Sequence, residues 1–454
     1  MLFPLVLILS TLTALLGGHL LFKITRNYCV YLFEIMFLLF FVVRPYFVYS
    51  FEILTFDLKR FGVENDAVLT YAACGLIFSV VFHRTVYKLY QRPSLFFDGW
   101  FRICNFDRIR RLRFFAVLCF FTVLTYFVNA LKFHSLGYFR QNLDSFEAGV
   151  NLQGGLWFLQ ILSWILIFPL IALVARNLDA RPVKLFGLLL IAMVGFYLIA
   201  RPSTRTETIS LLAAVAAYSF SVGKIRINLM SLAIISGGVI ALLVLLDALR
   251  QGNLQAGPEQ VGILGWLIGA FQNLGPADNG MILIDYLKHH SWLYFRYLLA
   301  SLSPLSLVPS ALFPYKPRTD IEGVLTYKLF GFDLDASMYH EGGTLTYTVP
   351  IAGYADLGFL GVIVAALLYG FIFAFFLRGW RSKSTSVRFI TMYYLILIIA
   401  GLRLSVEALM STFYWVILAT WVLHVISNSN FFVVPFANTR AQGLQSSHDA
   451  SNPG

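Results

Sequence analysis

Apolar stretches of about 20 residues recur along nearly the whole chain, and they constrain its fold more than any other feature. Coiled as a helix, such a stretch spans the hydrocarbon core of a bilayer and satisfies its own backbone hydrogen bonds there. Charged residues make up only 13% of the chain, against about 25% in a typical soluble domain. The pattern predicts an all-α polytopic membrane protein with about eleven transmembrane helices. We expect them at residues 2–22, 29–50, 67–87, 114–133, 155–175, 185–200, 208–222, 227–246, 349–377, 389–402 and 408–426.

The loops between these stretches alternate between rich and poor in Lys and Arg. Placing the strongly basic loop at residues 84–113 in the cytoplasm puts the other basic loops on the same side, as the positive-inside rule requires. The N-terminus is then outside and the C-terminus inside. The net charge of +11 belongs mainly beside anionic lipid headgroups, so we expect a lipid bilayer and no nucleic acid as its partner.

One connection, at residues 247–348 on the non-cytoplasmic side, is far longer than the others. Loops longer than about 15 residues usually have a function. Its apolar pieces at residues 261–271 and 292–312 suit short interfacial helices. We predict one transmembrane domain over residues 1–436 that includes this long loop. The polar, Gly/Ser/Asn-rich residues 437–454 are expected to form a disordered cytoplasmic tail.

A minority of the cations lies on the side where the positive-inside rule does not require them. These residues are Arg201, Arg205, Arg250, Arg296, Lys316, Arg318 and Arg403. Cations kept on that side indicate a bound anion reached from the periplasm or cell exterior. The planar fork of arginine suits phosphate because it holds two oxygens at once.

Two of the arginine segments border predicted spans. In the turn RPSTRTE at residues 201–207, Arg205 and Glu207 begin a helix, where backbone N–H groups also favour anions. Arg201 and Arg205 could instead reach lipid headgroups, or pair with Glu207. Arg250 follows the eighth span, and a local ion pair with Asp247 is its simpler interpretation.

Three prolines stiffen residues 308–320, VPSALFPYKPRTD, at the end of the long loop. Tyr315, Lys316 and Arg318 lie in this segment. Aromatic faces stack on sugars and cations hold phosphates, so the segment suits a glycolipid ligand. A proline-fixed lid without ligand contacts is the alternative.

The last candidates lie near the outer ends of the late spans. Tyr354 and Asp356 follow Gly353, one of several glycines in this span that suit close helix packing. Arg403 and Glu407 are spaced to pair with each other on a helix. Glu34 and Arg44 lie inside the second span, so they need buried partners, and we assign them no functional role. No HxH, HExxH or CxxC pattern suggests a metal site.

Together these segments resemble the Wzy-type O-antigen and oligosaccharide repeat-unit polymerases of bacteria. The resemblance covers the hydropathy pattern of most of the chain, with motifs from about Arg201 to Glu407. The small-residue turn of that family, which ends in Arg-Thr or Arg-Ala, matches residues 202–206 with its arginine at Arg205, and the arginine after its following span matches Arg250. Its late outer arginine matches Arg403.

Two further motifs of the family are similar to segments here. Its proline-rich basic segment matches residues 309–317, so its basic residue falls on Lys316, and its glycine-rich helix start matches residues 353–361, including Tyr354. The chain departs from the family at residues 202–203, where glycines are common. It also departs at Ala352, where many members carry Glu, so a carboxylate role is not available there.

The resemblance implies a glycosyltransferase C-like helical fold in the bacterial inner membrane, with an active site facing the periplasm. It implies transfer of a growing glycan from undecaprenyl pyrophosphate to a lipid-linked repeat unit, without metal or nucleotide sugar. A separate chain-length regulator protein is an implied partner. Under this hypothesis Arg205, Arg250 and Arg403 are catalytic and hold the diphosphate. Residues predicted to bind substrate are Arg201, Tyr315, Lys316, Arg318 and Tyr354.

The identity of the base and the reaction class stay open at this point. The attacking sugar hydroxyl could pass its proton to a carboxylate or histidine, and the sequence singles out none of the candidates. They are Glu207, His340, Glu341 and Glu407. An O-antigen ligase shares the layout of many spans and one large loop, while a lipid-linked oligosaccharide flippase or other transporter would not need that loop.

Overall fold

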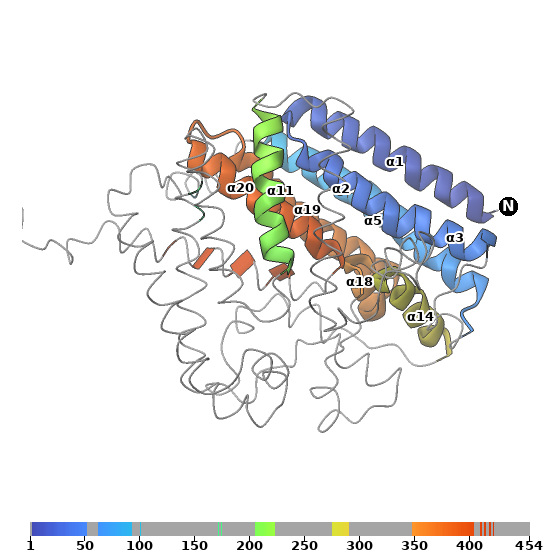
Figure 1. The fold of residues 1–454 in the computed structure, drawn as a ribbon. Coiled ribbons are helices and arrows are strands. Elements are labelled where there is room, and N and C mark those ends of the chain that lie inside the picture. The colour runs from blue at the N-terminus through green and yellow to red at the C-terminus, as the bar shows by residue number, and fades with distance from the viewer. Residues whose placement is uncertain are drawn as a thin grey trace, which may run out of the picture.

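The computed structural model describes residues 2–51, 62–92, 205–222, 275–289 and 347–403, together with positions 100, 171, 174 and seven between 409 and 421. Every regular element in this part of the chain is a helix (Figure 1). Four helical stretches are long and apolar enough to cross a membrane. They are α1 (Leu2–Thr25), the stretch Cys29–Ser50, α5 (Asn65–Gln91) and α19 (Phe359–Gly379). The helical membrane-protein prediction is confirmed for these four.

Two shorter apolar helices, α11 (Arg205–Ser221) and α20 (Thr385–Ala400), coincide with the predicted spans at 208–222 and 389–402. The expected spans at 114–133, 185–200 and 227–246 lie outside the described residues. Those at 155–175 and 408–426 are represented by isolated positions only.

Aromatic side chains form the centre of the bundle, where α5 and α19 pack lengthwise (Figure 1). The ring of Phe82 on α5 stacks on Phe33 at 4.2 Å and lies 5.7 Å from Tyr369 on α19. Tyr369 is fully buried, and its hydroxyl donates to the carbonyl of Ile398 on α20. Helix α1 covers the other side of α5 and turns a row of large apolar side chains outward, as a lipid-facing helix should. That row is Leu2, Leu5, Ile8, Leu9, Leu12, Leu15, Leu16 and Leu20.

The segments that the charge pattern puts on one side of the membrane meet at one end of this bundle. Arg378, at the end of α19, donates to the carbonyl of Arg92 after α5. The Arg381 guanidinium lies 3.9 Å from the centre of the Tyr90 ring. Lys88 and Arg388 belong to the same segments, so we call this the basic end. The grouping agrees with the predicted alternation of these spans.

The prediction of one continuous helix over residues 349–377 is wrong. Two helices, α18 (Val349–Leu357) and α19, are separated by Gly358, which has φ 60° and ψ −144°. This left-handed backbone suits glycine because it lacks a Cβ. Helix α18 folds back on the start of α19 so closely that Gly353 and Gly361 touch backbone to backbone. The predicted packing role is therefore confirmed for these two glycines, although between two helices within one predicted span.

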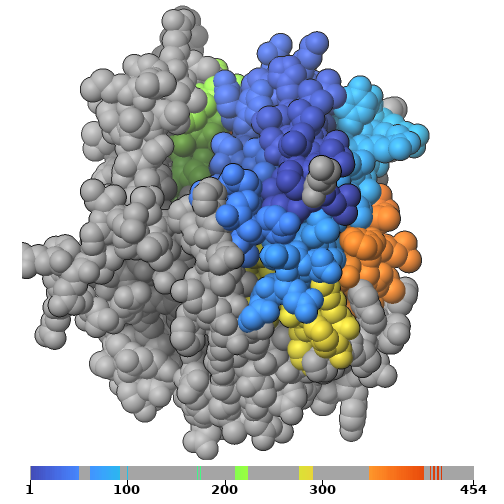
Figure 2. Space-filling model, turned by 90° about the vertical axis from the view of Figure 1, so that its right-hand side faces the viewer, coloured from blue at the N-terminus to red at the C-terminus, as the bar shows by residue number. Residues whose placement is uncertain are grey.

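The long loop contains a helix at a position where none was predicted. Helix α14 (Gly275–His289) has Pro276 near its start, Asp278 in its first turn, and Lys288 and His289 in its last turn, which are ordinary helix-boundary signals. It packs against α5 and α18, and Figure 2 shows it (yellow) beside the N-terminal helices (blue). The interfacial helices expected at 261–271 and 292–312 lie outside the described residues.

Candidate functional site

Four of the twelve predicted site residues lie in the described part of the chain: Arg205 and Glu207 in α11, Tyr354 in α18, and Arg403 in the short 3₁₀ helix η5 (Gly401–Arg403). The other eight lie outside it and stay predictions. They are Arg201, Arg250, Tyr315, Lys316, Arg318, His340, Glu341 and Glu407.

The first turn of α11 and the short helix η5 lie towards the same end of the bundle. Near the end of α11, the ring of Tyr218 lies 6.0 Å from Trp380, just before α20, and 6.0 Å from Phe389 in its first turns. Because the two helices pack along their length, α11 runs antiparallel to α20. Its start, with Arg205, therefore lies towards the end of α20, where η5 and Arg403 follow.

This end lies opposite the basic end, and it also contains α14 and α18. Helix α18 contacts η5 on one side and α14 on the other. We call the region formed by α14, α18, η5 and the first turn of α11 the α14 end. The charge pattern predicts that it faces away from the cytoplasm.

Tyr354 is largely enclosed in protein at the α14 end. Its side chain is 9% exposed, and its ring meets the edge of Phe359, in the first turn of α19, at 5.3 Å. These contacts favour a role in packing α18 onto α19. Its predicted contact with substrate stays untested.

Arg44, for which the sequence indicated no particular partner, is a buried charge at this end. Its Nε donates to Asp278 Oδ1 at 2.7 Å and its Nη2 to Oδ2 at 2.9 Å, and the two side chains are only 1% and 3% exposed. A two-point pair of this kind is the strongest geometry between these groups. Removing one partner of a buried pair typically costs about 3–5 kcal/mol, because the other charge is left uncompensated. With its charge neutralised by Asp278, Arg44 is unsuited to binding an anionic ligand.

A local change of helix geometry precedes Arg44. The stretch Cys29–Ser50 consists of α2 (Cys29–Leu38), a π-helical turn η1 (Leu39–Val43) and α3 (Arg44–Phe51). A π-turn takes up one extra residue, so it rotates the side chains that follow it relative to those before it. Glu34 contacts α5, whereas Arg44 contacts α14.

Tyr71 on α5 completes the surroundings of the pair. Its ring stacks on Phe41 at 5.1 Å and lies against Gly280 of α14, where an added Cβ would be 2.6 Å from Tyr71 Cε2. It lies within electrostatic range of Arg44 and Asp278. The hydroxyl lies near Thr348, but makes no hydrogen bond of ordinary geometry with any described residue.

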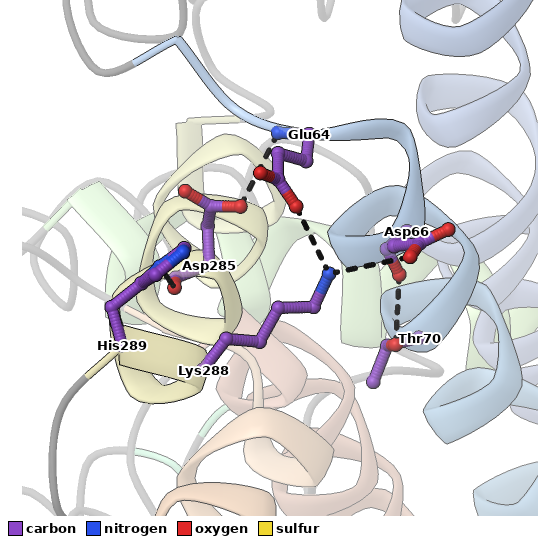
Figure 3. A network of polar contacts seen from close by, with 6 residues as sticks. All are labelled: Glu64, Asp66, Thr70, Asp285, Lys288 and His289. Atoms are coloured by element: carbon purple, nitrogen blue, oxygen red, sulfur yellow. Dashed lines mark hydrogen bonds and ion pairs between the residues drawn. The ribbon is translucent and has the colours of Figure 1, made fainter.

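A second, exposed network ties the last turns of α14 to the start of α5 (Figure 3). The backbone N–H of Glu64 donates to Asp285 at 3.3 Å, and Lys288 Nζ lies 3.6 Å from Glu64 and 4.0 Å from Asp66. Pairs at such exposed positions contribute about 0–1 kcal/mol each. Helix α14 is therefore held mainly by its buried contacts.

Glu34 also has a buried partner, nearer the basic end. Its Oε1 lies 2.7 Å from His83 Nε2, while His83 Nδ1 lies 2.7 Å from the carbonyl of Ser79. A carbonyl only accepts, so the Nδ1 carries the hydrogen and the Glu34–His83 contact shares one further proton. No pattern in the sequence indicates this pair, because its members come from different helices.

Glycines of α1 make room for this pair. A Cβ added at Gly18 would lie 2.5 Å from Glu34 Cγ, and one at Gly17 would collide with the His83 ring. We therefore expect Gly18→Val to push α1 away from α2 and α5 and to lower the stability of the protein by about 1–3 kcal/mol, the usual cost of overpacking. Thermal unfolding of the purified protein measures this loss. Leu16→Val, on the outward row of α1, is the control, and equal midpoints for the two variants would contradict the expectation.

No protein-family model, curated protein or solved structure matches this chain. Within the described residues, no group of three His, Cys, Asp or Glu side chains could hold a metal ion. The α14 end contains the first turn of α11 and η5, which carry Arg205 and Arg403, and a loop helix fixed by a buried ion pair.

Proposed function

We propose that the chain is a polysaccharide repeat-unit polymerase that works at the α14 end. It transfers a growing glycan from undecaprenyl pyrophosphate to a lipid-linked repeat unit, in the bacterial inner membrane and on its periplasmic side. Arg205, Arg250 and Arg403 hold the donor diphosphate, and Lys316 and Arg318 help to bind the two glycolipids. A chain-length regulator is a further proposed partner.

One observation carries the proposal: α11 and η5, which carry Arg205 and Arg403, both reach the end of the bundle opposite the basic end. Topology does not call for arginines there, whereas the chemistry does. In the transfer, an acceptor hydroxyl attacks the anomeric carbon, and the bond from that carbon to the diphosphate oxygen breaks. Negative charge grows on the departing undecaprenyl pyrophosphate, and preorganised guanidinium groups stabilise it.

The described helices support a shared location for two of the three arginines. Arg205 begins α11 and Arg403 ends η5, and both elements reach the α14 end. The proton of the acceptor hydroxyl goes to one of the candidate bases, Glu207, His340, Glu341 or Glu407. Each of them is close in sequence to, or in the same loop as, a proposed ligand arginine or lysine.

Analysis of the glycans made by a deletion strain tests the proposal. Loss of a polymerase leaves lipopolysaccharide capped with a single repeat unit, whereas loss of a ligase leaves uncapped core. Purified protein incubated with two lipid-linked repeat units should form a new glycosidic bond. A transporter would form no glycosidic bond. Uncapped core in the deletion strain, or a purified protein that forms no such bond, would therefore overturn the proposal.

A further inference from the structure

Helix α14 belongs to the long loop, yet its first half is enclosed in the bundle. All residues from 276 to 284 are buried, and they contact α5, η1 and α18. Asp278 points to Arg44, and Gly280 lies against Tyr71 and Ile351. The loop is thus joined to the transmembrane helices at a defined point.

Residues 290–346 begin where α14 ends and finish where α18 begins, so the packing of these two helices fixes both ends of that segment. It carries five predicted site residues: Tyr315, Lys316, Arg318, His340 and Glu341.

We propose that Arg44 and Asp278 are positioning residues that seat α14 against α5 and α18 and so fix both ends of the segment that joins α14 to α18. Neither side chain touches substrate. The link to glycan transfer rests on the proposed function, whereas the seating of α14 does not. Arg44 is suited to this role because its two-point contact fixes the orientation of Asp278 as well as its distance.

Cysteine labelling tests the seating directly. Met281→Cys creates a thiol at a fully buried position of α14, and the native Cys29, buried against Met392, reports on the bundle itself. A water-soluble maleimide is applied to permeabilised membranes, and modified peptides are quantified by mass spectrometry. Permeabilised membranes make the result independent of the side that α14 faces.

In the Met281→Cys background, we expect Asp278→Asn or Arg44→Met to speed labelling at position 281 at least about tenfold, since an unpaired buried charge shifts local equilibria by more than that factor. Cys29 should stay protected. The double variant Arg44→Met with Asp278→Leu should restore protection, because apolar groups can replace a buried ion pair. Two matched controls should leave position 281 protected: Lys288→Ala, which breaks the exposed network, and Glu34→Ala, which breaks the other buried pair.

The outcomes separate local seating from general stability. Unchanged labelling at position 281 in both single variants would overturn the proposal, and so would equal gains at position 281 and Cys29, or an equal gain in the Glu34→Ala control. In cells, the single variants should lose long-chain glycan at wild-type protein abundance, and the double variant should regain it. Release of α14 with a normal glycan ladder would overturn the positioning role, whereas failure of the polymerase proposal would leave the labelling result intact.

Discussion

Replacing Arg205 by alanine is expected to abolish long-chain surface glycan while the protein stays in the membrane at its normal abundance. If Arg205 stabilises the charge that grows on the leaving diphosphate, its loss should slow transfer by about 10²–10³-fold, as removal of a comparable charge-stabilising donor does. Growth of a polymer multiplies this deficit, because every added repeat unit needs another transfer. Gel separation of lipopolysaccharide from a complemented deletion strain measures the result as a ladder or its absence.

Two further variants sharpen the interpretation of Arg205. Arg205→Lys keeps the charge but loses the planar fork, so we expect short chains rather than none. Arg381→Ala removes a cation at the basic end, where the guanidinium lies over the Tyr90 ring, and it should leave the ladder unchanged. A normal ladder from Arg205→Ala would contradict the role of this residue. Loss of the ladder from Arg381→Ala would show that the assay responds to cations in general.

Hydropathy predicted the described spanning helices well, because lipid imposes the same requirement on each of them. Helices α1 and α5 and the stretch Cys29–Ser50 cover the predicted ranges, since an apolar run must form its hydrogen bonds internally wherever it crosses the membrane. Hydropathy did not predict the break at Gly358 between α18 and α19. Residues on both sides of it are mainly apolar, so hydropathy cannot distinguish one long helix from two helices in contact.

The partners in the buried polar contacts could not be predicted from the sequence, because these contacts join distant parts of the chain. Arg44 and Asp278 are separated by 234 positions, and Glu34 and His83 by 49. The need for a partner could be inferred from a charge within an apolar span, whereas the identity of the partner depends on which helices pack together. Helix α14 has ordinary boundary signals, but its apolar residues are interrupted by Asp278, Asp285 and Lys288, so it does not stand out as an apolar stretch within the long loop.

We expect the largest loss of stability from substitutions at the contact between Gly353 and Gly361. A Cβ on either glycine would overlap the backbone carbonyl of the other, and backbone atoms cannot rotate aside as a side chain can. The two helices must therefore separate. We expect Gly361→Ala to cost at least the upper part of the usual range of about 1–3 kcal/mol for overpacking, and Gly361→Leu to prevent stable folding.

Gly370→Ala is the matched control for Gly361→Ala, because it makes the same substitution on the same helix. An added Cβ there would lie 3.1 Å from the Thr85 side chain, a contact that a small shift relieves, and alanine favours a helix interior by about 0.5–1 kcal/mol over glycine. Thermal unfolding in detergent should therefore show a large fall for Gly361→Ala and almost none for Gly370→Ala. Since Arg403 lies in η5, which contacts α18, the Gly361 variant should also lose glycan synthesis whenever it folds. A fully stable Gly361→Ala protein would mean that α18 does not fold back on α19, and the arrangement of the α14 end argued from that contact would have to be abandoned.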